Sequence, residues 1–436
     1  MADIRPFRGV HYSESLIKDC STVICPPYDI ITPQQQEELY QSSQYNFIRL
    51  ESGRELPQDT PTDNKYTRAV TTLEQWLEQG VLEFDRVPAI YLHDHYFRHQ
   101  AKEYRRRSII ARVRLEEWDK KVIRPHEGTL TEPRGDRLSL LWALQANTSP
   151  ILALFEDRDR QISSVLSRQE KNKPVISSRS PGREGHDVWA ITDVESVRQI
   201  SSRLAEQPLY IADGHHRYES ALTYRLEKGN FSASASGEEP DNFVMMELVD
   251  FSDPGLIILS PHRLVRGIAR PVLNELMAKL DVFFEIEELP LSLPDAGKQV
   301  SDLLTGTGRV RLILFGLSRE HLLTLKLRDH TAASRMMPQF HSKLYKKLDV
   351  SIIDHIILEN LLELSSEKEK TSLTYSYDVA DALNRVLNQE YQLALLFNPA
   401  KPEVIKAIAD VGDKMPRKST YFYPKSPSGL VFNRLV

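Results

Sequence analysis

An acidic residue, a glycine, two histidines and an arginine follow one another within PLYIADGHHRYESALTYR, residues 208–225. The apolar run at 209–212 predicts a short strand. Apolar side chains that recur at helical spacing between Tyr218 and Arg225 predict a helix that begins near His216. The DGHHR motif, residues 213–217, therefore lies where a strand passes into a helix.

The start of a helix is a place where chemistry can be done on an anion. Backbone N–H groups and the positive end of the helix dipole gather there, and phosphate is a natural guest. Gly214 lets a ligand approach the backbone closely, and Arg217 adds a planar fork that suits phosphate. A simpler interpretation stays open, in which Asp213 caps the helix and His215 and His216 are surface residues.

Three common motifs are excluded as explanations of this junction. The chain has no GxxxxGK[ST] loop and no GxGxxG fingerprint, so the usual phosphate loops are missing. Adjacent histidines at a helix start point in different directions, and the i, i+4 spacing of a helical zinc pair is absent.

A second group of polar residues is the run His126-Glu127-Gly128-Thr129, which Arg137 follows shortly afterwards. Glu127 is a candidate general base or magnesium ligand, and Arg137 is a candidate for neutralising phosphate. The alternative is an exposed polar loop in which Asp136 or Ser139 caps the next helix.

Two further candidate groups follow predicted strands. Ser260-Pro261-His262-Arg263 comes after the apolar LIIL, and Lys418-Ser419-Thr420 comes shortly before Lys425. Both bring cationic or hydroxyl groups to a strand end, where ligand sites in α/β sheets commonly lie. His93 and His95 alternate along one strand, and without other ligands at a diagnostic spacing we interpret them as ordinary polar-face residues.

Composition bounds the class of protein. The 436 residues are 41% hydrophobic and 27% charged, which is typical of a globular chain of two or three domains. A net charge of -5 argues against nucleic acid as the main partner. The sequence is also compatible with a homo-oligomer. Cys20 and Cys25 support neither a disulfide framework nor a zinc site of cysteines.

The order of predicted elements indicates a mixed α/β (α+β) fold. We predict an N-terminal α/β domain over 1–264 that carries HEGT and DGHHR. A C-terminal α/β domain over 265–436 is predicted to contribute its KSTYFYPK segment to the same site. The first residues lack an apolar signal region, and no stretch reaches the length of a membrane span, so we expect a cytoplasmic protein.

Several motifs, in this order along the chain, resemble the family of proteins catalogued as domain of unknown function 1015. They are CPPYDII (25–31), YNFIRLE (45–51), HEGT (126–129), LYIADGHHRYESAL (209–222), LSPHRLV (259–265) and MPRKSTYFYPKSPSGLVF (415–432). The DGHHR element is also similar to that of free-serine kinases built on a ParB/sulfiredoxin-type fold. This resemblance implies a ParB/sulfiredoxin-like nucleotide-binding core with an additional α/β region at the C-terminus.

The resemblance implies roles for individual residues. Gly214, His215, His216 and Arg217 would cradle the phosphates of ATP or ADP, and Asp213 would position Mg2+ or the accepting hydroxyl. Glu127, Asp213 and His216 are the candidate catalytic residues, and Asp213 is the candidate metal ligand. The remaining candidates for nucleotide binding are His126, Thr129, Arg137, His262, Arg263, Lys418, Ser419 and Thr420.

Three functions fit this inventory. The first is nucleotide-dependent phosphorylation of free L-serine or a related hydroxyl compound, for which a carboxylate, a metal and several cations are sufficient. The second is a phosphoserine phosphatase or a nucleotide hydrolase, which would use the same residues with water as the acceptor. The third is a regulatory module that binds nucleotide in the manner of ParB-type proteins.

Overall fold

The computed structural model describes residues 1–129, 131–178, 184–229, 237–305 and 312–436. Over these residues the chain forms two compact units, each made of more than one segment. Unit 1 comprises residues 1–125, 129–257 and 424–436, and unit 2 comprises residues 126–128 and 258–423. The division into domains at 264 and 265 stays a prediction.

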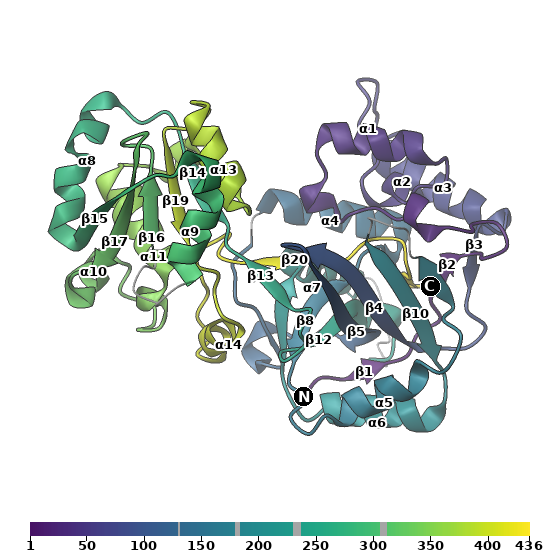
Figure 1. The fold of residues 1–436 in the computed structure, drawn as a ribbon. Helices are drawn as coiled ribbons and strands as arrows, with labels where there is room; N and C mark the ends of the chain where they lie inside the picture. The colour runs from purple at the N-terminus through teal and green to yellow at the C-terminus, as the bar shows by residue number, and fades with distance from the viewer. Residues whose placement is uncertain (130, 179–183, 230–236, 306–311) are drawn as a thin grey trace. The chain divides into compact units, whose positions relative to one another are not determined.

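Unit 1 is built on a large mixed sheet (Figure 1), nine-stranded over the described residues. The strand order is β6 (Ile123–Arg124), β11 (Leu209–Asp213), β8 (Ile151–Phe155), β12 (Phe243–Asp250), β5 (Lys102–Arg114), β4 (Ile90–His99), β10 (Gly185–Ile191) and β9 (Ile176–Ser178), with β1 (Ile4–Arg5) paired to β5. Strands β6 and β11, and β8 and β12, are parallel, whereas the other pairs are antiparallel. The mixed α/β fold predicted from the sequence is confirmed.

Helices cover both faces of this sheet, which explains why the inner strand β8 is apolar along its whole length. One core packs sheet residues against α5 (Gln161–Gln169), α6 (Val194–Leu204) and α7 (His215–Gly229). The opposite core packs them against α2 (Ile48–Glu51) and α3 (Lys65–Glu78). The short apolar strand expected before DGHHR is β11, and the expected helix is α7, which begins one residue earlier than predicted.

Helix α4 (Thr131–Leu144) packs against α7 and contributes to both cores. Its Leu141 lies in the core with α7, while Leu140 and Leu144 lie in the core with α3. On α7, the Tyr218 hydroxyl donates to the Glu116 carbonyl over 2.8 Å and accepts from the Glu116 N–H over 2.9 Å. These contacts hold the start of α7 against the rest of unit 1.

Unit 2 contains a second, antiparallel sheet. Its order is β15 (Phe284–Pro290), β17 (His321–Leu327), β16 (Leu312–Phe315), β19 (Leu393–Phe397), β14 (His262–Val265) and β18 (Leu373–Ser376). Helices α9 (Ala296–Thr305) and α13 (Val379–Leu387) pack on it through Val300 and Leu383. Unit 2 also contains α8 (Arg270–Phe283), α10 (His330–Met336), α11 (Asp349–Ile352), α12 (Ser366–Ser372) and α14 (Pro402–Asp410).

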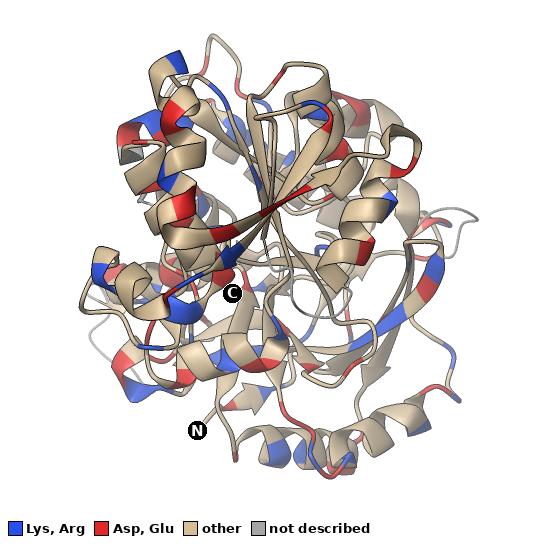
Figure 2. Ribbon diagram, turned by 60° about the vertical axis from the view of Figure 1, so that its left-hand side comes forward, with Lys and Arg blue, Asp and Glu red and all other residues tan. Residues whose placement is uncertain are grey.

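Charged residues of both signs are spread over the helices (Figure 2), in keeping with the small net charge of -5. Among the described residues, no helix combines the length and the apolar character that crossing a bilayer requires.

Gly316, which follows β16, provides a test of the fold of unit 2. Its φ is +122°, and a Cβ atom there would lie 2.1 Å from the Gln392 carbonyl oxygen. We expect Gly316→Ala to lower the free energy of unfolding by about 3 kcal/mol or more, because strain and a backbone clash add. Thermal unfolding followed by circular dichroism measures the change.

Gly412→Ala is the matched control. Its φ is +74°, but no atom lies within 4 Å of the added Cβ, so only the backbone strain of about 1 kcal/mol is expected. Equal losses in the two variants would contradict the steric explanation.

Candidate functional site

The strand-to-helix junction of unit 1 is shaped around Gly214. Asp213 is the last residue of β11, His215 is the first residue of α7, and Gly214 between them has a φ of +93°. A Cβ atom at this position would lie 2.9 Å from the Nε and Nη2 atoms of Arg217. The glycine is needed both for its left-handed backbone and because the Arg217 side chain folds back over it.

The Asp213 carboxylate lies between two cations. Its Oδ2 accepts a hydrogen bond of 2.7 Å from Arg217 Nη2, and its Oδ1 accepts one from Lys425 Nζ. Burial alone would raise the pKa of Asp213, but the charges of Lys425 and Arg217 outweigh it and hold the pKa well below its usual range. Asp213 is therefore ionised at neutral pH.

Arg217 is held by two acceptors but keeps one donor unused. Its Nη1 donates to the Pro150 carbonyl oxygen and its Nη2 to Asp213, while its side chain is only 10% exposed. Its Nε is buried and has no hydrogen-bond partner in the described part of the chain. A buried donor of a charged group without a partner is costly, and a ligand atom that reached Nε would offset this cost.

Arg137, predicted from the loop after HEGT, contributes to the same neighbourhood of unit 1. Its Nη1 donates to the Glu51 carbonyl oxygen over 3.0 Å, and its guanidinium lies 4.0 Å from the centre of the Tyr28 ring. Burial raises the pKa of Tyr28 to about 12, against the opposing charges of Arg217 and Arg137. Tyr28 thus lies close to both arginines.

A small cavity of about 40 Å3 lies between these arginines. Its polar lining comes from Arg137, Asn147, Thr148, Ser149, Arg217 and Ser220. The volume is enough for a few water molecules or the oxygens of one anion, but not for a nucleoside.

A C-terminal segment, residues 424–428, completes the neighbourhood, and we call it the strap. Lys425 contacts Asp213 and lies 3.9 Å from Asp29 Oδ2. Ser428 forms backbone hydrogen bonds of 2.8 and 3.1 Å with Cys25, three residues before Tyr28. The strap therefore joins the CPPYD and DGHHR motifs within unit 1.

Among the predicted residues of unit 1, the structure brings together Asp213, Gly214, His215, Arg217 and Arg137. His216 is the second residue of α7 and is half-buried. Thr129 instead donates to Glu219 Oε2 on the second turn of α7.

Unit 2 gathers a second set of predicted residues. Glu127 Oε1 accepts hydrogen bonds from the Ser419 and Thr420 N–H groups over 3.1 and 3.3 Å. His126 Nε2 lies 2.9 Å from Thr420 Oγ1, and Lys418, with a φ of +54°, precedes the turn. Glu127 thus stabilises the KST turn.

Arg263 is a buried structural cation of unit 2. It is fully buried and pairs with both oxygens of Asp354 over 3.1 and 3.0 Å, while Nη1 donates to the Lys418 carbonyl oxygen over 3.0 Å. The adjacent His262 is also buried, and burial together with the Arg263 charge lowers its pKa to about 4.

Sequence reasoning from individual residues missed Tyr28, Asp29, Glu51 and Ser149, and it grouped Lys425 with the KST residues. The signal was present in the quoted motifs, because CPPYDII contains Tyr28 and Asp29, and YNFIRLE ends with Glu51. What those motifs did not reveal is that their polar residues meet at Arg137 and the strap.

Comparison with known proteins agrees with the resemblance of these motifs. The model of the family described as Protein of unknown function (DUF1015) matches residues 4–351. The chain belongs to this family. The comparison with curated proteins finds no match.

Solved structures similar to this chain include a free serine kinase mutant in complex with AMP, at 12% identity and a TM-score of 0.38. The similarity covers 74% of this chain and 91% of that one. A conserved hypothetical protein from Pyrococcus furiosus has 14% identity, a TM-score of 0.36 and coverage of 75% and 95%. SbnI from Staphylococcus aureus, truncated at its C-terminus, has 9% identity, a TM-score of 0.34 and coverage of 73% and 85%. Similarity at this level assigns neither a site nor a substrate to this DUF1015 protein.

The depressed pKa of His262 makes a testable contribution to stability. A group whose folded pKa is lowered to about 4 contributes stability that is present above the unfolded value of about 6.5 and is lost as the pH falls between them. We expect this loss to be about 3 kcal/mol. Urea unfolding at pH 7 and pH 4 should show a smaller pH dependence in His262→Asn than in the unmodified protein.

The control is His330→Asn, which changes an exposed histidine at the start of α10. It should retain the full pH dependence. A His262→Asn variant with an unchanged dependence would contradict the assignment.

Proposed function

We propose that unit 1 binds the phosphate groups of ATP or ADP at the junction of β11 and α7 and transfers a phosphoryl group to the hydroxyl of a small metabolite. Free L-serine is the first substrate to test, because DGHHR resembles the motif of free-serine kinases. The observation that carries the proposal is the buried Arg217 Nε, an unpartnered cationic donor at a helix start beside a glycine with positive φ.

The charges of the junction favour an arriving phosphate. Asp213 holds Arg217 and Lys425 in place by its two oxygens, so both cations are oriented before a ligand binds. A phosphate at the start of α7 would meet the positive end of the helix dipole, the Arg217 Nε and the Lys425 ammonium. We assign His215 and His216 to the same phosphates, as the resemblance to free-serine kinases implies.

The carboxylates around Lys425 fit a Mg2+ ion bound with phosphates. Asp213 Oδ1 and Asp29 Oδ2 both face Lys425 Nζ, and Mg2+ is usually held by one or two carboxylates together with substrate phosphates. Asp213 would hold the ion, which would supply charge neutralisation on the phosphates when bound. Lys425 would then turn from Asp213 toward the phosphate.

Asp29 is the carboxylate of this neighbourhood best placed to accept a substrate proton. Its side chain is 28% exposed, whereas Glu51 is fully buried and both oxygens of Asp213 are engaged. In the proposed step the hydroxyl oxygen bonds to the terminal phosphorus, the bond to the nucleotide's bridging oxygen breaks, and the hydroxyl proton passes to Asp29. Glu127 was predicted as a catalytic base. We now propose that it stabilises the turn at Ser419 and Thr420, which follows Lys418.

The cationic fork is tested by Arg217→Lys, which keeps the charge and removes Nε and the second Nη. We expect kcat/KM for nucleotide-dependent phosphorylation to fall about 100-fold, because one preoriented donor contributes on that order. Formation of phosphoserine from L-serine, ATP or ADP and Mg2+ is the measurement.

Arg198→Lys is the control, since Arg198 is an exposed arginine of unit 1 paired with Glu195 over 2.8 Å. It should leave the rate unchanged. No product from any nucleotide, or equal rates in the two variants on an identified substrate, would refute the proposal.

The proton acceptor is tested by Asp29→Asn. We expect kcat to fall by about 100-fold or more, because a positioned base contributes on that order. The affinity for ADP, measured by calorimetry without Mg2+, should stay within a few-fold, since the phosphate donors remain. An unchanged kcat would assign the proton to another group.

A phosphatase or nucleotide hydrolase remains the second candidate, because an exposed Asp29 beside a phosphate site could equally activate water. Release of phosphate from phosphoserine without nucleotide would favour it. Nucleotide binding without turnover of any substrate would favour the regulatory module instead.

A further inference from the structure

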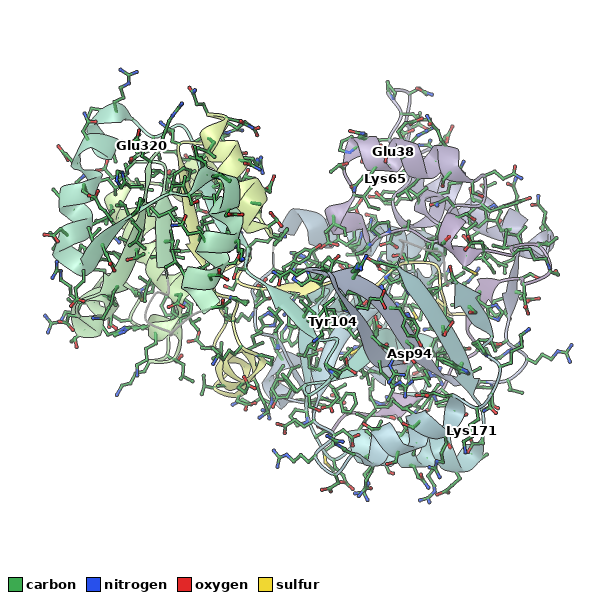
Figure 3. The ribbon with its side chains drawn as sticks, viewed as in Figure 1. Glu38, Lys65, Asp94, Tyr104, Lys171 and Glu320 are labelled. Atoms are coloured by element: carbon green, nitrogen blue, oxygen red, sulfur yellow. The ribbon has the colours of Figure 1, made fainter. Side chains whose placement is uncertain are left out.

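Three histidines lie close together within the sheet of unit 1. Two of them, His93 and His95, were interpreted from the sequence as ordinary polar-face residues. His93 and His95 alternate along β4 with Asp94, which Figure 3 labels, so the two histidines lie on one face and Asp94 on the other. His186 on the neighbouring β10 lies directly opposite His95. The three histidines are 1%, 0% and 2% exposed.

The ring nitrogens of this cluster face one another and a carboxylate. His95 Nε2 lies 2.8 Å from Glu184 Oε2, and His93 Nε2 lies 3.1 Å from His186 Nδ1. One ligand atom each of His95, Glu184 and His186 lies within 4.8 Å of the other two. A tetrahedral ion with bonds of about 2 Å separates its ligands by about 3.4 Å, so small side-chain movements suffice.

The groups behind the histidines are those that orient metal ligands. Glu247, fully buried on β12, accepts from His93 Nδ1 over 3.0 Å and from the Ser108 hydroxyl over 2.6 Å. A carboxylate on Nδ1 places the proton there and leaves the Nε2 lone pair facing His186.

We propose that His95, His186 and Glu184 form a site for a divalent transition-metal ion of the zinc type, with His93 beside them as a positioning residue that contacts His186. Imidazole nitrogens favour such ions over Mg2+ and Ca2+, which prefer oxygen ligands. The site is therefore distinct in chemistry from the phosphate junction and does not depend on the proposed function. The Glu184 side chain is 44% exposed, which provides an entry path for the ion.

Metal binding at this site requires that Arg106 give up a hydrogen bond. Its Nη2 lies 3.3 Å from His95 Nδ1 and its Nη1 donates to the Pro424 carbonyl oxygen over 2.8 Å. Coordination through His95 Nε2 moves the ring proton to Nδ1, so Arg106 gives up its bond to His95 and keeps the one to Pro424. A shift of this guanidinium accompanies metal binding.

The ion would also stabilise the strap. The Ser426 hydroxyl donates to Glu247 Oε2, and Lys425 beside it contacts Asp213. A metal on His186 would strengthen the contact between His186 and His93, and through Glu247 and Ser426 this supports the position of Lys425.

The experiment uses the full chain freed of metal by a chelator and titrated with Zn2+ or Co2+. We expect one Zn2+ per chain by elemental analysis, a higher Tm, and visible absorption of Co2+ typical of nitrogen and oxygen ligands. His186→Ala should weaken Co2+ binding at least tenfold, and Glu247→Gln about 10- to 100-fold.

His99→Ala, which removes a histidine at the end of β4 outside the cluster, is the matched control and should bind as the unmodified chain does. Because His186→Ala changes a buried residue, Glu184→Gln on the exposed side serves as a second variant and should alter the Co2+ spectrum. Absence of stoichiometric binding, or a spectrum and affinity unchanged in Glu184→Gln, would overturn the proposal.

Discussion

The geometry of unit 1 depends on one carboxylate shared by two cations. Asp213 ends the buried strand β11 and binds Arg217 from the following helix, α7, and Lys425 from the strap. Without either partner, a mostly buried ionised carboxylate would be strongly destabilising, so both must be in place in the folded chain. The same contacts orient the two cations, and the function that we propose makes use of that orientation.

The strap connects two polar clusters on different parts of the sheet. Lys425 belongs to the phosphate junction, whereas the next residue, Ser426, belongs to the buried histidine cluster through Glu247. Arg106 donates a hydrogen bond to the carbonyl oxygen of Pro424, the residue before Lys425. Three consecutive strap residues, Pro424, Lys425 and Ser426, each contact a different buried charged residue. A structural change in one cluster can therefore be transmitted to the other through the strap.

The resemblance of the quoted motifs was sufficient for the family. Apolar runs and helical spacing, which act over a few residues, were sufficient for the mixed α/β fold, β11 and α7. They could not show that Arg137 lies by Tyr28, or that His186 lies opposite His95, because these neighbours come from strand order and register. His93 and His95 were interpreted as ordinary polar-face residues for the same reason. A histidine pair on one strand becomes informative only when the adjacent strand is known.

Asp213 and Lys425 are separated by 212 positions in the chain, and most of unit 2 lies between them. At 5 to 20 residues per second, a ribosome needs roughly 10 to 40 s to pass from one to the other. During that interval β11 and α7 are present, but Asp213 lacks its lysine and the strap is missing. The nascent chain therefore completes this site only after Lys425 has emerged, which delays any ligand-driven stabilisation of the junction until then.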